Sequence, residues 1–90
     1  SSTIAVCGLD YYNYSLIPAW QNSLLMCTLK DESLRLLNLS NDGLSIVGQQ
    51  TLFKNKYGRI RDICISPGGK VYLCTSNGSN SDVLVEISKP

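Results

Sequence analysis

The sequence predicts an all-β protein, and two observations support that fold class. Its apolar residues gather in seven short segments of about five to ten residues, a length typical of strands. Clusters of Gly, Pro, Asn, Asp and Ser separate these segments, and no stretch carries a convincing 3.6-residue helical period. With 90 residues, the chain can form one small domain built from antiparallel strands and tight turns.

The expected strands and turns alternate along the whole chain. The third segment is rich in leucine and could be read as helical, but its short length and flanking turn residues favour a strand. Asn41, Asp42 and Gly43 predict a hairpin turn because these residue types tolerate positive φ. Residues 67–69, Pro-Gly-Gly, predict a second one. In chain order, the expected strands are residues 4–12, 23–29, 34–39, 44–53, 59–66, 71–75 and 82–88.

The segment after the first expected strand is a loop that holds the single tryptophan, Trp20. We expect Trp20 to pack under this loop as an anchor, with stacking against a sugar as the alternative. Strand alternation places Tyr12 and Tyr14 on one face and Tyr11 on the other, where core or interface packing is the default role.

A weak internal repeat relates residues 24–39 to residues 60–75. Both stretches are an apolar strand, a short turn and a second strand, about 36 residues apart, close to the length of one four-stranded propeller blade. The chain would then hold a little under two blades, whereas repeat folds usually need about three units for stability. It would therefore be part of a larger propeller, or a different fold, or a chain that assembles with its own copies.

Composition excludes several classes of function. The net charge of +1 gives no electrostatic footprint for nucleic acid or an anionic membrane, and no apolar run is long enough to span a bilayer. No signal peptide is expected in these residues. The sequence has no histidine, which removes the commonest general base and the commonest transition-metal ligand.

Four cysteines lie within apolar runs and form no Cys-x-x-Cys pair, which excludes zinc-ribbon and thioredoxin motifs. They are Cys7, Cys27, Cys64 and Cys74. We expect buried free thiols that act as small hydrophobic residues. The alternative is a disulfide between neighbouring strands, and Cys64 and Cys74 are the pair to test because they lie on two arms of one expected hairpin.

Two arginines at the start of an apolar strand form the main candidate site. Because residues two apart share a strand face, Arg59 and Arg61 are expected to point the same way, with Asp62 on the opposite face as a structural hydrogen-bond acceptor. Two adjacent guanidinium groups on a rigid strand suit a multiply charged anion, such as a carboxylated cofactor or a phosphate. The alternative is that both arginines lie on a solvated strand face.

Three sequence blocks, taken in order, resemble the C-terminal part of the soluble quinoprotein glucose/sorbosone (aldose sugar) dehydrogenases. Residues 3–12 are similar to that family's Ser/Thr-x-Ala-Pro-Ser-Gly-x-x-Phe/Tyr-Tyr run. Residues 18–30 resemble its Pro-x-Trp-x-x-x-Leu-x-x-x-x-Leu-Lys strand. Residues 58–75 contain Gly-Arg-Ile-Arg-Asp, then Ser-Pro-x-Gly and Val-Tyr-Leu-x-Thr. Val6 and Cys7 depart from the family's Pro-Ser, and Thr75-Ser76 departs from the Thr-Asp of some members.

The resemblance implies a six-bladed β-propeller that binds pyrroloquinoline quinone (PQQ) and calcium and oxidises a sugar. Residues 1–53 would form about one blade and residues 54–90 the last blade. Carried over by position, the cofactor contacts are Lys30, Arg59 and Arg61, with Thr3 as a further contact. A solvated turn lysine is the alternative role for Lys30. The family's catalytic histidine and calcium loops lie upstream, so this segment would supply only cations to the cofactor site and would be inactive alone.

The resemblance also implies an extracellular or periplasmic location and, as partners, the rest of a propeller chain or further copies of this one. Two other functions stay open at this stage. The chain could belong to a non-enzymatic propeller that binds a ligand or protein, or it could be a self-associating all-β structural segment without a small-molecule site.

Overall fold

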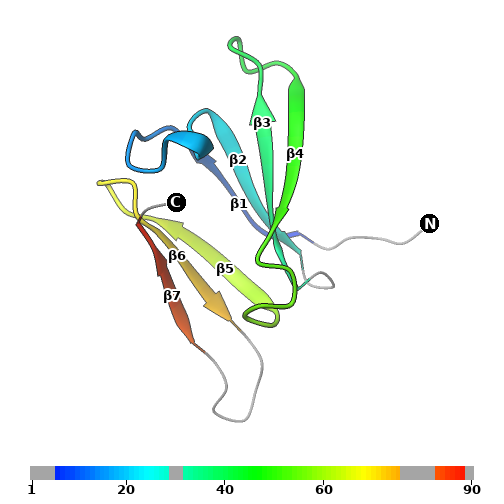
Figure 1. Ribbon diagram of the computed structural model, residues 1–90, viewed down its shortest axis with the longest axis vertical. Coiled ribbons are helices and arrows are strands. Elements are labelled where there is room, and N and C mark those ends of the chain that lie inside the picture. The colour runs from blue at the N-terminus through cyan, green and yellow to red at the C-terminus, as the bar shows by residue number, and fades with distance from the viewer. Residues whose placement is uncertain (1–5, 29–31, 76–82, 89–90) are drawn as a thin grey trace, which may run out of the picture.

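In the computed structural model, residues 6–28, 32–75 and 83–88 are described, and for Val6 and Cys7 only the backbone. These residues form two antiparallel sheets, which confirms the all-β prediction (Figure 1). The first sheet has the order β1-β2-β3-β4 and the second the order β5-β6-β7. The strands are β1 (Val6–Tyr12), β2 (Ser23–Thr28), β3 (Leu34–Leu39), β4 (Ile46–Leu52), β5 (Ile60–Ile65), β6 (Val71–Thr75) and β7 (Leu84–Ile87).

The expected strands agree closely with the observed ones. The expected segments 34–39 and 71–75 match β3 and β6 at both ends, while β4 and β7 are shorter than expected. The one helical element within the described residues is a 3-10 turn, η1 (Pro18–Trp20), in the loop between β1 and β2. Among the described residues, no helix is long and apolar enough to cross a membrane.

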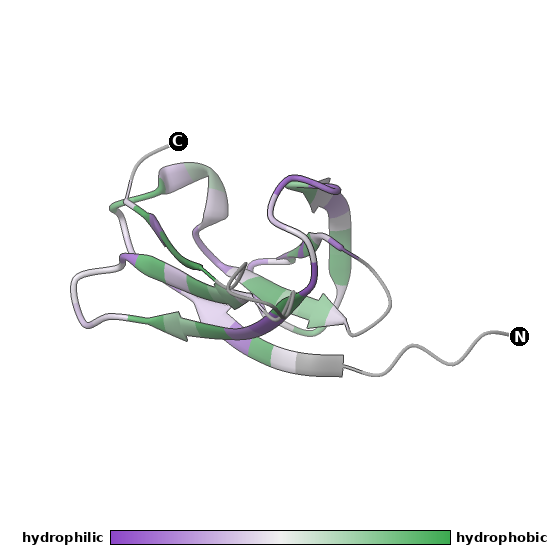
Figure 2. Cartoon of the chain, turned by 90° about the horizontal axis from the view of Figure 1, so that it is seen from below, coloured by the Kyte–Doolittle hydropathy of each residue, from purple (hydrophilic) through white to green (hydrophobic). Residues whose placement is uncertain are grey.

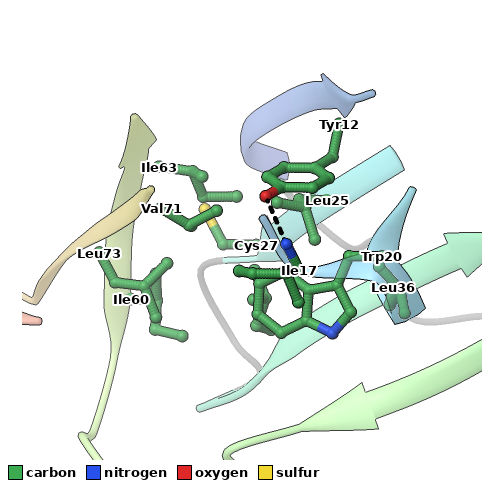
Figure 3. Packing of buried hydrophobic residues seen from close by; sticks show 11 residues of the cluster. Tyr12, Ile17, Trp20, Leu25, Cys27, Leu36, Ile60, Ile63, Val71 and Leu73 are labelled. Atoms are coloured by element: carbon green, nitrogen blue, oxygen red, sulfur yellow. Dashed lines mark hydrogen bonds between the residues drawn. The ribbon is translucent and has the colours of Figure 1, made fainter. Parts of the chain in front are cut away.

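The two sheets meet where their first strands come together. Strand β5 lies against β1 and β2, while β4 and β7 are the outer strands of their sheets (Figure 1). The core between the sheets is built from alternate residues of both, because one face of each strand is apolar. Its buried side chains are Tyr12, Ile17, Trp20, Leu25, Cys27, Leu34, Leu36, Ile60, Ile63, Val71 and Leu73, most of which are labelled in Figure 3.

A buried tyrosine joins the two sheets at one end. The Tyr12 hydroxyl donates a hydrogen bond to the carbonyl oxygen of Gly69, 2.5 Å away, in the turn between β5 and β6. It also accepts one from the backbone N–H of Ile17 at 3.3 Å, drawn as a dashed line in Figure 3. One phenol therefore ties the β1–β2 loop to the β5–β6 turn.

The aromatic residues lie as the alternation predicts. Tyr12 is buried, Tyr14 packs half-buried against the same core, and Tyr11 is exposed on the other side of β1. Trp20 is buried, and its ring lies edge-on to Tyr12 with centroids 6.2 Å apart. The anchor role predicted for Trp20 agrees with this packing.

The cysteine prediction is wrong in two respects. Cys27 is buried but disulfide-bonded, so it is not a free thiol. Cys64 and Cys74 are free but exposed, since both lie on the face of their sheet that turns away from the core. They also cannot be the bonded pair: Cys64 lies opposite Tyr72 and Cys74 opposite Asp62, so the two cysteines are diagonal neighbours.

Candidate anion-binding site

The candidate site lies at the end of the molecule where β4 passes into β5. Residues 53–59 form this connection, the β4–β5 loop, which leads directly into the strand at the sheet junction (Figure 1). Viewed from below in Figure 2, the connection is a largely hydrophilic stretch next to apolar strand segments. Four basic side chains, Lys54, Lys56, Arg59 and Arg61, lie exposed within eight positions, and no acidic residue lies between them.

Both candidate arginines are exposed, on either side of a buried residue. Arg59 is the last residue before β5, and Ile60, almost fully buried, fixes the strand in the core between it and Arg61. The exposure of both side chains fits a ligand site and a solvated strand face equally, and their common orientation stays a prediction. Arg59 also has an interaction partner in the folded chain.

The alternation predicted for Asp62 is wrong because β5 contains a bulge. Ile60 pairs with Thr75 and Asp62 with Cys74, so Arg61 is an extra residue in the ladder. After the bulge, Ile63 is buried and both Arg61 and Asp62 are exposed. The structural role expected for Asp62 is supported: its Oδ1 accepts a hydrogen bond from the backbone N–H of Ile63 at 2.8 Å.

The bulge also places the Asp62 carboxylate beside the first sheet. A Cβ built on Gly8 of β1 would lie 3.3 Å from Asp62 Oδ1 and 3.3 Å from Cys27 Sγ. The lack of a side chain at Gly8 therefore allows this close approach of β1 to β5. Asp62 therefore lies at the sheet junction, directly after Arg61 in the sequence.

An unusual backbone holds the β4–β5 loop in shape. Phe53, Asn55 and Gly58 have φ of 56°, 57° and 79°, all in the left-handed region. That region suits Gly and Asn but is costly for a bulky residue such as phenylalanine. The Phe53 ring offsets this cost by packing against the core, with centroids 6.5 Å from Trp20 and 5.6 Å from Tyr57.

Further contacts of the loop fix one of the four cations and connect the loop to the first sheet. Lys56 Nζ lies 5.9 Å from the Phe53 ring centroid and 5.4 Å from that of Tyr57, within the range of a cation–π contact. The backbone N–H of Asn55 donates to the carbonyl oxygen of Glu32 at 2.7 Å. The loop is thus bonded to a residue two positions from Lys30 in the sequence.

The other two candidate site residues, Lys30 and Thr3, lie outside the described residues. Sequence reasoning also did not single out Lys54 and Lys56 as neighbours of the arginines. The signal was present in residues 54–61, Lys-Asn-Lys-Tyr-Gly-Arg-Ile-Arg, where four of eight residues are cations and none is an acid. Within the described part of the chain, no group of three or more His, Cys, Asp or Glu side chains is placed to hold a metal ion.

Comparison with known proteins identifies the family. Residues 1–85 match the family model described as glucose/sorbosone dehydrogenase, and the chain belongs to that family. It is 31% identical over 84 residues to aldose sugar dehydrogenase YliI of Escherichia coli (strain K12), an alignment that covers 93% of this chain and 22% of that protein.

Solved structures give the same result. A crystal structure of a glucose dehydrogenase superimposes with a TM-score of 0.78 and 28% identity, over 92% of this chain and 23% of that one. A second glucose dehydrogenase gives 0.76 and 28%, over 92% of this chain and 25% of that one. The chain therefore spans about a quarter of the length of the relatives that it matches.

Proposed function

We propose that this chain is a cofactor-holding C-terminal segment of a PQQ-dependent sugar dehydrogenase. The observation that carries the proposal is the exposed pair Arg59 and Arg61, which flanks a buried isoleucine at the start of β5. A strand fixed in the core on both sides of such a pair gives guanidinium groups a rigid base. Family membership is the basis for proposing a sugar substrate and a quinone cofactor. The arginines of this site would provide the positive charges that bind the cofactor.

In this proposal the two sheets are consecutive blades of a six-bladed propeller. Residues 1–53 form one blade and residues 54–90 the last, with β1 and β5 as their inner strands. Two features support it: the sheets diverge from a junction at β1 and β5, and the chain covers about a quarter of its relatives. The exposed side chains of Leu9 and Tyr11 on the far face of the first sheet would then pack against a preceding blade.

The chemistry of the cations fits the proposed cofactor. PQQ carries three carboxylates beside an ortho-quinone and, when bound, accepts the two electrons and the hydrogen removed from the sugar. Arg59 and Arg61 would each bind a carboxylate through a two-pronged guanidinium, a charge-assisted contact that also fixes orientation. Lys30 and Thr3 would add contacts from the first blade.

Other parts of the longer polypeptide would complete the enzyme. The catalytic base and the calcium ligands would come from other blades, since this chain has no histidine. An extracellular or periplasmic location is part of the proposal, and the disulfide at Cys27 supports it because disulfides persist in oxidising compartments.

The experiment is a PQQ titration of the full-length protein that contains this chain. Arg59→Ala and Arg61→Ala should each weaken PQQ binding about tenfold to a hundredfold, the range for losing a charge-assisted hydrogen bond. Arg→Lys should restore binding only in part, because lysine lacks the planar fork.

Lys70→Ala is the matched control. Lys70 is also an exposed cation, but it follows the turn at the far end of β5, about 20 Å away at strand spacing. It should bind PQQ as wild type does. Wild-type affinity in both arginine variants would refute the cofactor role and favour a non-enzymatic binding propeller. Loss of folding in those variants would instead make the arginines structural.

A further inference from the structure

The outer edge of the first sheet differs from the other sheet edges of the described chain. The edge strands are β1, β4, β5 and β7, since each pairs with a single neighbour. Three of them carry charged residues: Asp10 in β1, Arg61 and Asp62 in β5, and Glu86 in the short β7. Strand β4, Ile-Val-Gly-Gln-Gln-Thr-Leu, has seven residues and neither a charge nor a proline.

Charges, prolines and short length are the features that keep natural sheet edges from pairing with other chains. Strand β4 lacks them, and its main irregularity is a bulge between Asn38 and Leu39 of β3, which leaves Val47 as the extra residue near the start of β4. Residues 48–52 continue in regular pairing with β3, so they offer a straight row of unpaired backbone groups on the outer side. Figure 1 shows β4 on the side of the molecule away from the second sheet.

Apolar side chains also gather at this edge. Ile46 and Val47 at the start of β4 and Leu44 in the turn just before it are 57%, 67% and 85% exposed, three of the seven exposed large hydrophobic residues of the described chain. Such exposure is costly to leave in water and is typical of a surface that another chain covers.

We propose that β4 is an association edge that pairs with β4 of a second copy of this chain. The strand is self-complementary: a twofold axis through its centre sets it antiparallel to its copy, and no like charges then face each other. Gln49 and Gln50 are both exposed at that centre. Because an amide both donates and accepts hydrogen bonds, each glutamine can bond to a glutamine of the second copy. This pairing joins the two first sheets into one continuous sheet, independently of any cofactor.

The test is the concentration dependence of the mass of the 90-residue chain by sedimentation equilibrium. Wild type should show a weak reversible dimer. The double variants Q49K/Q50K and Q49E/Q50E place like charges opposite each other whichever glutamine lies on the axis. Each should raise the dissociation constant about tenfold, and an equimolar mixture of the two should restore dimerisation.

Two further measurements separate edge pairing from association through sheet faces. The control N41K/G68K adds the same charge at exposed turn positions outside β4 and should dimerise as wild type does. Amide hydrogen exchange should slow within β4 as the wild-type concentration rises. The proposal fails if wild type stays monomeric at high concentration. It also fails if the lysine and glutamate variants associate as wild type does, or if their mixture gains nothing.

Discussion

Gly69 offers the sharpest test of how the two sheets are joined. Its φ is +92°, a conformation that costs a residue with a Cβ about 1–2 kcal/mol. A Cβ at this position would lie 2.7 Å from the Cβ of Tyr14, 3.0 Å from the Tyr12 hydroxyl and 3.2 Å from the Cβ of Leu16. Two of these atoms are close to the backbone and cannot move aside cheaply.

The expected effect of Gly69→Ala follows from these contacts. Overpacking costs about 1–3 kcal/mol, and displacing the buried Tyr12 hydroxyl from the Gly69 carbonyl leaves polar groups unpaired at about 1–3 kcal/mol. Together with the backbone term, we expect Gly69→Ala to lower the free energy of unfolding by about 3 kcal/mol or more.

The neighbouring glycine is the control. Gly68 has no positive φ, and a Cβ there would meet no atom within 4 Å. Gly68→Ala should therefore be neutral or stabilise slightly, by about 0.4–1 kcal/mol, through the entropy of the unfolded chain. Urea unfolding followed by the fluorescence of Trp20, the single tryptophan, measures both variants. Equal stability of the two variants would refute this description of the joint.

Three further results are expected. Tyr12→Phe removes the buried hydroxyl that binds Gly69 and Ile17 and should cost about 1–3 kcal/mol in urea unfolding, whereas Tyr11→Phe, which loses an exposed bond to Asn22, should stay within about 0.5 kcal/mol. The Tyr72 hydroxyl donates to Glu86 at 3.0 Å, which together with partial desolvation raises the pKa of Tyr72 above its ordinary value. Because the folded pKa is raised, this contribution to stability is present below the unfolded pKa near 10 and is lost as pH rises through the folded pKa. Glu86→Gln should lower the pKa of Tyr72 in an ultraviolet titration, and an unchanged midpoint would exclude the carboxylate as the cause. Finally, the 90-residue chain with added PQQ, calcium and glucose should show no dye reduction above a buffer control, and turnover by this chain alone would overturn the assignment of roles.

The strands could be predicted from the sequence because their signals are local. β3 and β6 alternate apolar core-facing residues with others, β6 ending on the buried Thr75, and turn residues flank both strands, so their limits were predicted to the residue. The sides on which Tyr11, Tyr12 and Tyr14 lie followed from alternation in the same way. The resemblance of the three blocks also led to the family that the comparisons show.

What the sequence could not reveal depends on irregular backbone and on pairing between distant strands. The bulge at Arg61 changes the side on which every later residue of β5 lies, and nothing local in Arg-Ile-Arg-Asp marks it. The left-handed φ of Phe53 is contrary to the preference of a bulky side chain and is stabilised by Trp20, which is distant in sequence. Cys64 and Cys74 are exposed because they lie on the face of the second sheet that does not pack against the first. Their apolar sequence neighbours gave no indication of this, since the buried face depends on how the two sheets meet.

The most direct test of the cofactor role is a crystal structure of the full-length protein with PQQ bound. We expect carboxylate oxygens of PQQ within about 2.7–2.9 Å of the guanidinium nitrogens of Arg59 and Arg61, the separation of charge-assisted N–H···O contacts. A structure in which PQQ binds through other elements while both arginines face solvent would contradict the proposed function.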